Sequence, residues 1–242
     1  MDIIPQRNQA MSAHIQKPQI RMRNVVKAYL TGGETFAALK GVSLEINAGE
    51  FVGIIGKSGA GKTTLINMLT GVDHLTSGEV WVDDVPVHRL DENRLATWRG
   101  RNLGIIYQSF YLMPTLTLLQ NVLLPMDLAG KFQLRRSEAQ ARELLHEVEL
   151  DAHVHKLPSQ VSGGQQQRAA IARALANDPQ IIVADEPTGR LDSQTAETIF
   201  RVFLSLVEQG KTIVMVTHDK SLSSRVSRVI RIADGELFTE DD

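Results

Sequence analysis

A chain of 242 residues can bury the core of one large α/β domain with an inserted subdomain, and it is short for two fully independent domains. The formal net charge of −2 and the aromatic content of 5% argue against a global basic surface and an aromatic stacking platform, so we expect no nucleic-acid partner. The absence of cysteine excludes disulfides, thiolate metal ligands and a thiol nucleophile, and it fits a reducing cytoplasm.

Residues 1–19 are predicted to form a polar tail. They lack the continuous apolar stretch of a signal peptide and carry Asp2, Pro5 and Arg7 where that stretch would lie. The longest apolar runs, at 51–55 and 181–184, fall far short of the roughly 18 residues that cross a bilayer. Any role at a membrane would therefore have to come through a partner.

The chain then opens with short predicted strands. Apolar and β-branched residues favour strands at 20–29 and 39–46, and the turn NAGE separates the second from a strand at 51–55. A helix with apolar residues on one face follows and is expected to end at Gly71. The alternating pattern at 77–84 predicts another, half-buried strand.

The apolar spacing changes to that of helices between residues 109 and 178. In the stretch 137–150, for example, Ser137 is placed to cap a helix. The apolar stripe of that helix consists of Ala141, Leu144, Leu145 and Val148. Strands and helices alternate again afterwards, so the predicted core has two parts, 20–108 and 179–242, which flank a helical insert at 109–178.

The stretch GKSGAGKTT lies between a predicted strand and a predicted helix, where the phosphate-binding pattern G-x-x-x-x-G-K-[ST] belongs. Its glycines let backbone N–H groups surround phosphate oxygens, Lys62 brings positive charge to the β- and γ-phosphates, and the Thr63 hydroxyl can ligate Mg²⁺. Thr64 is expected to contact the α-phosphate. The predicted phosphate-binding residues are Gly56, Lys57, Ser58, Gly59, Ala60, Gly61, Lys62, Thr63 and Thr64. The alternative is a glycine turn with an exposed lysine.

Two adjacent carboxylates follow the apolar run at 181–184. That run suits a strand buried on both faces, which delivers Asp185 and Glu186 to the edge of a parallel sheet where phosphates bind. We expect Asp185 to hold Mg²⁺ and Glu186 to polarise the water that attacks the γ-phosphate. Because neighbouring side chains of a strand point to opposite faces, the pair can share one site only where the strand ends, and Pro187 marks that end. The alternative is an acidic turn.

A second glycine-rich stretch, VSGGQQQR, places Ser162, Gly163, Gly164 and Gln165 at the N-terminus of a predicted helix. A helix N-terminus has free N–H donors and partial positive charge, so this segment is a second possible anion site. The first glycine loop already binds the phosphates of the nucleotide that its own chain holds. We therefore predict that two chains pair head to tail, each closing this segment over the other's nucleotide, with a plain helix cap as the alternative.

From residue 20 to residue 237 the chain resembles the ATP-binding cassette (ABC) ATPases. GKSGAGKT is similar to the Walker A motif of that family, IIVADE to Walker B and VSGGQ to the signature, in the family's order. The resemblance implies an α/β fold: a P-loop NTPase core of the ABC type with an N-terminal antiparallel β subdomain and an inserted α-helical subdomain. It also implies ATP hydrolysis, with ATP and Mg²⁺ as ligands.

Further site residues follow from the resemblance alone. Gln108 corresponds to the Q-loop residue that senses Mg²⁺ and water, and Tyr29 to the aromatic residue that stacks on adenine. Asp192 corresponds to the D-loop aspartate, and His218 to the switch histidine that positions the γ-phosphate. The implied catalytic residues are thus Glu186, His218, Lys62 and Gln108. Taken individually, Gln108 and Tyr29 suit ordinary surface or core positions, and a lone histidine is usually structural.

Within the family, the segments SGGQQQR, ADEPTG and QSFYLMPTLT are most similar to lipoprotein-releasing, macrolide-exporting and cell-division ATPases. Two positions depart from the family pattern. Val161 opens the signature in place of leucine, and Arg190 stands at a D-loop place usually held by a smaller or uncharged residue. Val161 is a conservative change, whereas Arg190 is expected at the subunit interface, where it would pair with a partner carboxylate or weaken closure.

The resemblance implies a homodimer around two MgATP that drives a separate integral membrane permease, for export or extraction of a lipophilic substrate or lipoprotein. It also implies a cytoplasmic location, peripheral on the inner face of the cell membrane through that permease. The apolar stretch 110–118 is a candidate for docking the permease, with plain insert core as the alternative. Two other functions stay open: mechanotransmission to an extracytoplasmic machine without transport, and a soluble ABC ATPase that acts on nucleic acid or ribosomes. The latter usually has long coiled-coil insertions or two cassettes, and this sequence has neither.

Overall fold

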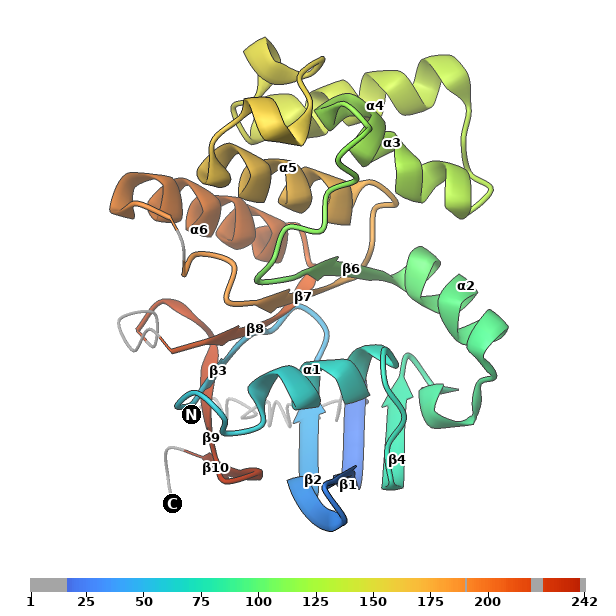
Figure 1. The fold of residues 1–242 in the computed structure, drawn as a ribbon, viewed down its shortest axis with the longest axis vertical. Helices are drawn as coiled ribbons and strands as arrows, with labels where there is room; N and C mark the ends of the chain where they lie inside the picture. The colour runs from blue at the N-terminus through green and yellow to red at the C-terminus, as the bar shows by residue number, and fades with distance from the viewer. Residues whose placement is uncertain (1–16, 190, 219–223, 240–242) are drawn as a thin grey trace, which may run out of the picture.

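The computed structural model describes residues 17–189, 191–218 and 224–239. Arg190 and most of the predicted tail lie outside these ranges. Figure 1 shows an antiparallel sheet at the bottom, a mostly parallel sheet in the middle and a group of helices above it. None of the helices in the described ranges combines the length and the apolar content that crossing a bilayer requires.

The central sheet of the described chain has the strand order β10-β9-β3-β8-β7-β6. Its strands are β3 (Phe51–Ile55), β6 (Leu103–Ile106), β7 (Ile181–Asp185), β8 (Thr212–Thr217), β9 (Arg228–Ala233) and β10 (Glu236–Thr239). Neighbouring strands from β9 to β6 run parallel, whereas β10 is antiparallel to β9. The strands β3, β7 and β8 are almost entirely buried apolar runs because helices or the second sheet cover both faces.

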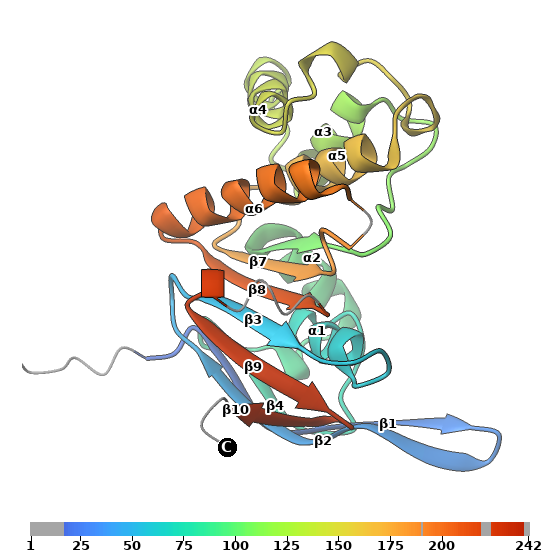
Figure 2. The ribbon, with the colours of Figure 1, turned by 90° about the vertical axis from the view of Figure 1, so that its left-hand side faces the viewer.

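The second sheet is antiparallel, with the order β2-β1-β4-β5. Its strands are β1 (Ile20–Thr31), β2 (Glu34–Ile46), β4 (Ser77–Val82) and β5 (Val85–Pro86). The hairpin between β1 and β2 turns at Gly32 and Gly33, both with positive φ, as a tight two-residue turn requires. Figure 2 shows this hairpin projecting beyond the rest of the molecule. The strand β2 starts five residues earlier than the sequence pattern suggested, since this turn extends the pairing.

Helices lie on both sides of the central sheet. They are α1 (Lys62–Thr70), α2 (Glu92–Asn102), α3 (Leu118–Leu128), α4 (Leu134–Glu147), α5 (Gly163–Leu175) and α6 (Ser193–Glu208). Successive residues of β7 alternate between two apolar cores: Ile181 and Val183 pack with α1 and the antiparallel sheet, and Ile182 and Ala184 pack with α3 to α6. Figure 1 shows the same division, with α1 below the sheet and α3 to α6 above it.

One predicted helix start was wrong. The helix α4 begins at Leu134, with Gln133 as its N-cap, so Ser137 lies inside the helix and does not cap it. The Ser137 hydroxyl is buried and accepts a hydrogen bond from the Gln133 N–H at 2.9 Å. The serine thus satisfies a donor of the first turn from within the helix. The predicted apolar stripe on this helix is correct, with Ala141 and Leu145 fully buried.

Candidate functional site

The glycine loop between β3 and α1 leaves no room for a side chain at two of its glycines. A Cβ atom at Gly56 would lie 2.5 Å from the Ile232 carbonyl oxygen. At Gly61 it would lie 2.7 Å from the Ala38 carbonyl oxygen, and the φ of Gly61 is +103°. The helix α1 begins directly after this loop with no side-chain cap and no acidic residue in its first turn. Its N–H groups and partial positive charge are therefore not neutralised by the side chains of that turn.

Lys62 is 7% exposed, and its side chain folds back along the loop. The ammonium group donates to the carbonyl oxygens of Gly56 and Lys57 at 3.0 and 3.1 Å and lies 3.8 Å from a carboxylate oxygen of Glu186. Lysine is rarely buried this deeply without partners. The loop thus holds a fixed positive charge beside its own amides, which is the electrostatic setting for a polyanion.

Thr63 and Asp185 join the glycine loop to the end of β7. The Thr63 hydroxyl donates to Asp185 Oδ2 at 2.9 Å. Burial raises the pKa of the Asp185 carboxyl above its ordinary value, with the Glu186 charge acting in the same direction and the Thr63 hydrogen bond opposing it. Hydroxyl and carboxylate oxygens are the hard donors that Mg²⁺ prefers, so this pair fits that ion.

Glu186 is turned toward the same cavity as Asp185 by its backbone. Its φ of +47° departs from strand geometry just where β7 ends, while its N–H still donates to the Val216 carbonyl at 2.9 Å. This turn explains how two adjacent carboxylates reach one cavity. The Glu186 carboxylate accepts a hydrogen bond from Gln108 Nε2 at 3.0 Å, and His218 Nδ1 lies 3.4 Å from its other oxygen.

A cavity of about 650 Å³ joins these groups. Its lining residues are Tyr29, Phe36, Ala38, Ser58, Gly59, Gly61, Lys62, Thr63, Thr64, Gln108, Asp185, Glu186 and His218. Three predicted loop residues, Gly56, Lys57 and Ala60, line a neighbouring hollow of about 690 Å³ on another side of the loop. The cavity combines a polar, charged floor with an aromatic rim, as a nucleotide requires.

The aromatic rim includes a residue that sequence reasoning missed. Phe36 faces Tyr29 across the β1–β2 hairpin, and both line the cavity. Tyr29 is held by a hydrogen bond from its hydroxyl to Asp73 at 2.9 Å, and the Lys27 ammonium lies 4.7 Å from its ring centroid. Burial and Asp73 raise the pKa of the Tyr29 hydroxyl. The double-glycine turn was the signal that would have revealed this pairing, because it fixes the hairpin register.

The second glycine-rich segment does not line this cavity. Ser162 is the N-cap of α5, and its N–H donates to Gln165 Oε1 at 2.9 Å while its hydroxyl accepts from the Gln165 N–H at 3.3 Å. Ser162 and Gly163 are exposed. The cap predicted as an alternative is therefore present, and the segment is at the same time open to a second molecule.

Asp192 also lies outside the cavity lining. It is the N-cap of α6 and accepts hydrogen bonds from the Gln194 and Thr195 N–H groups and from the Thr195 hydroxyl at 2.7 Å. The Thr195 hydroxyl is the main reason that the pKa of Asp192 is lowered. A Cβ atom at Gly164 would be 3.7 Å from Thr195, so the two helix N-termini adjoin.

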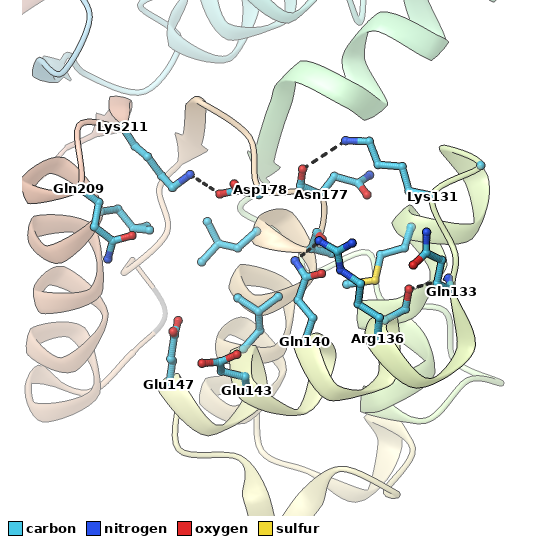
Figure 3. Close-up of a pocket in the computed structure, with 17 residues that line it drawn as sticks. Lys131, Gln133, Arg136, Gln140, Glu143, Glu147, Asn177, Asp178, Gln209 and Lys211 are labelled. Atoms are coloured by element: carbon cyan, nitrogen blue, oxygen red, sulfur yellow. Dashed lines mark hydrogen bonds and ion pairs between the residues drawn. The ribbon is translucent and has the colours of Figure 1, made fainter.

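A larger cavity, of about 880 Å³, lies elsewhere, between α4 and the C-terminal ends of α5 and α6 (Figure 3). Polar groups in it already bridge the surrounding elements. Lys211 pairs with Asp178, Gln140 donates to the Ala176 carbonyl, and Lys131 reaches the Asn177 carbonyl. Its labelled charged side chains carry both signs, and its hydrogen bonds join neighbouring elements of the chain, so we interpret this cavity as a junction between helices.

A glycine loop around a buried lysine, a hydroxyl–carboxylate pair and a second carboxylate at the end of parallel strands define a P-loop nucleotide-binding protein. The family model described as "ABC transporter" matches residues 39–189. The chain belongs to the ABC transporter ATP-binding proteins and is an ATPase that takes ATP with Mg²⁺.

The sequence similarity to known proteins covers almost the whole chain. The lipoprotein-releasing system ATP-binding protein LolD of Francisella tularensis is 44% identical over 216 residues, 89% of this chain and 94% of that protein. The probable syringafactin export ATP-binding/permease protein SyfD of Pseudomonas syringae is 40% identical over 95% of this chain, which corresponds to 34% of SyfD.

A solved structure is also similar. It is the dimeric, post-hydrolysis state of the ATP-binding cassette MJ0796 of Methanocaldococcus jannaschii, bound to ADP and Pi. The TM-score is 0.87 at 43% identity, with 91% of this chain and 98% of that chain covered. The predicted fold class is thereby confirmed.

Proposed function

We propose that two copies of this chain close around two MgATP and drive a separate membrane permease that exports or extracts a lipophilic substrate or lipoprotein. One observation carries the proposal: the glycine loop, the Thr63–Asp185 pair and the Glu186 carboxylate surround one cavity, while the signature segment at Ser162 is exposed elsewhere. A site that is divided in this way is completed by a second chain.

The glycine loop and Lys62 would bind the phosphates. The uncapped first turn of α1 offers N–H donors, and the Lys62 ammonium can exchange its loop carbonyls for phosphate oxygens. Thr63, Asp185 and Gln108 would hold Mg²⁺, which when bound neutralises charge on the phosphate oxygens. Tyr29 would stack on the adenine.

Glu186 would accept the proton of the attacking water. Gln108 donates to its carboxylate and His218 lies 3.4 Å from it, so the base is held from two further elements of the chain. His218 would also position the γ-phosphate. Proton acceptance by Glu186 and the charge of Lys62 together stabilise the transition state of phosphoryl transfer.

The second copy would supply the signature segment. In a head-to-tail pair with two-fold symmetry, the N-terminus of α5 from one chain meets the glycine loop of the other. Ser162, Gly163, Gly164 and Gln165 would then contact the γ-phosphate from across the interface, with Asp192 beside them. The dimeric state of the MJ0796 cassette supports this arrangement.

The membrane partner would dock on the first part of the loop 110–118. Tyr111 and Met113 are 64% and 45% exposed, whereas Leu118 is fully buried at the start of α3. The buried Asn121 fixes the loop, because its side chain accepts from the Met113 N–H and donates to the carbonyls of Met113, Leu116 and Thr117. An ordered loop with exposed apolar side chains suits a permanent protein partner.

The proposed location follows from that partner: peripheral on the cytoplasmic face of the membrane. The combined ATP-binding and permease chain of SyfD and the lipoprotein-releasing system of LolD support an export or extraction role. Mechanotransmission without transport would use the same cassette and remains the second candidate.

A capture experiment tests the membrane partner. Glu186→Gln protein, loaded with ATP, is incubated with gently solubilised membranes of the native host, and copurifying proteins are identified. We expect a polytopic membrane protein. In this background, Tyr111→Ser combined with Met113→Ser should lose the partner, while Leu128→Ser, at a 79% exposed residue at the end of α3, should retain it. With Glu186 intact, the Tyr111→Ser and Met113→Ser pair should keep basal ATP hydrolysis. Recovery of only ribosomes, nucleic acid or soluble proteins would refute the transport role.

A further inference from the structure

A histidine outside the motifs contacts the signature segment. Nε2 of His153 lies 2.8 Å from Nε2 of Gln165, twelve residues further along the chain. His153 ends a short 3₁₀ turn, Asp151–His153, which precedes the signature. Neither the motif pattern nor the helical spacing of the sequence marks this residue.

The backbone around His153 is fixed from two sides. Leu119, at the start of α3, donates its N–H to the Val154 carbonyl at 3.0 Å. Arg168 of α5 donates to the Val148 carbonyl at 3.0 Å and to the Glu149 carboxylate at 2.9 Å. The imidazole is therefore held at a defined place relative to the N-terminus of α5.

The hydrogen bonds of Gln165 determine which ring nitrogen of His153 carries the proton. Gln165 Oε1 must accept from the Ser162 N–H, because the reverse orientation of the amide would place two donors face to face. The Gln165 NH₂ group consequently points at His153 Nε2, which must accept. The neutral imidazole then carries its proton on Nδ1, and this atom is buried without a hydrogen-bond partner among the described residues.

We propose that His153 is a positioning residue for the signature segment: its Nε2 accepts from Gln165 and so keeps the Gln165 amide in the orientation that caps Ser162. This inference rests on the proposed function in one respect, namely that Ser162 to Gln165 serve the nucleotide of the second copy. Without the acceptor, the Gln165 NH₂ loses its partner and the side chain is free to leave Ser162, which weakens the order of the segment that must meet the γ-phosphate.

The test compares three substitutions in the Glu186→Gln background. His153→Leu removes the acceptor, and His153→Gln restores it, since glutamine Oε1 reaches about as far as imidazole Nε2. His155→Leu is the matched control, because His155 is an exposed histidine two residues away. ATP-driven dimerisation is followed by sedimentation over a range of ATP concentrations, and binding of a fluorescent ATP analogue to the monomer is measured in parallel.

We expect His153→Leu to raise the ATP concentration for half-maximal dimerisation by about 5- to 30-fold, the equivalent of one lost hydrogen bond in each signature segment. His153→Gln should stay within about threefold of the parent and His155→Leu should be unchanged. Analogue binding to the monomer should be the same in all four proteins, because His153 does not line the cavity. Dimerisation of His153→Leu at parental ATP concentrations would overturn the proposal.

Nitrogen NMR of the His153 ring gives an independent reading that needs no dimer. A proton on Nδ1 and a bare Nε2 support the proposal, and a proton on Nε2 overturns it even if the substitutions behave as expected. If the parent itself fails to dimerise with ATP, the proposed head-to-tail function fails, while the NMR result still decides the His153 contact.

Discussion

Gln108 donates a hydrogen bond to Glu186 at 3.0 Å, although 78 residues separate them in the chain. The contact crosses from the loop after β6 to the end of β7, two strands that are neighbours in the parallel sheet. The carboxylate proposed as the base is thereby held by the residue from which the docking loop continues. Loss of either side chain should therefore affect the same chemical step.

A double-mutant cycle tests this coupling. Glu186→Gln should lower kcat for ATP hydrolysis by about 10²- to 10⁴-fold, because the proton acceptor is lost, and ATP affinity should change little. Gln108→Ala should lower kcat by about tenfold in the parent and cause no further loss in the Glu186→Gln background. Phosphate release under saturating ATP measures both. Fully additive losses would show that the two residues act independently.

The glycine loop provides a stability test. Gly61→Ala should destabilise the fold by about 1–3 kcal/mol, since φ is +103° and the new Cβ would meet the Ala38 carbonyl at 2.7 Å. Gly100→Ala is the matched control in helix α2, where a Cβ has no neighbour within 4 Å, and it should stabilise by up to about 1 kcal/mol. Urea unfolding of both variants gives the comparison. Equal effects would contradict the role assigned to the loop backbone.

Two substitutions in the β1–β2 hairpin test whether the aromatic rim binds the nucleotide base. Phe36→Ala should weaken ATP binding about three- to tenfold if Phe36 adds apolar contact to the base beside Tyr29. Leu30→Ala is the control: Leu30 is 78% exposed on the same hairpin, more than the 60% of Phe36, but it does not line the cavity. Equilibrium binding of ATP measures both variants. A larger loss from Leu30→Ala would point to general disruption of the hairpin.

Asp185 links nucleotide binding to stability. Burial raises the pKa of this carboxyl in the folded state, so the folded chain binds the proton more tightly than the unfolded chain. The stabilising contribution of this group is present below the unfolded pKa, near 4, and is lost as pH rises through the higher folded value. At pH 7, Asp185→Asn should therefore increase the free energy of unfolding of the nucleotide-free protein by about 0.5–2 kcal/mol, which raises its unfolding midpoint.

The same variant should lose the extra stability that MgATP confers on the parent, because the carboxylate ligand is gone. Thermal unfolding with and without MgATP measures both effects. A lower midpoint for nucleotide-free Asp185→Asn, or full retention of the MgATP effect, would count against the assignment.

Local patterns predicted much of the site. The loop from Gly56 to Thr64 and the strand ending at Asp185 are contiguous in sequence, so spacing and apolar runs were sufficient to place them. The expectation that the two carboxylates meet where the strand ends agrees with the positive φ of Glu186.

Contacts between distant segments could not be predicted in this way. Phe36 reaches the cavity only through the register of the hairpin, and His153 meets Gln165 only after α3 and α5 pack against the turn that carries it. Ser137 was misplaced as a cap because a serine before an apolar stripe has the same pattern whether the helix begins at that residue or one turn earlier.

The two ends of helix α5 lie at two proposed contact surfaces, the loop that would meet the permease and the signature segment that would meet the second copy. Near its last turn, Arg173 donates to the carbonyl oxygens of Phe110 and Tyr111 in the loop proposed to meet the permease. At its other end lies the N-cap Ser162, about 16 Å from Arg173 along the helix axis at 1.5 Å per residue. A helix of this length moves as a rigid body, so a small tilt imposed at Arg173 also displaces Ser162. If the permease docks on this loop as proposed, a shift of its contact would change how the signature segment of one copy meets the glycine loop of the other, without unfolding any element and without touching the nucleotide.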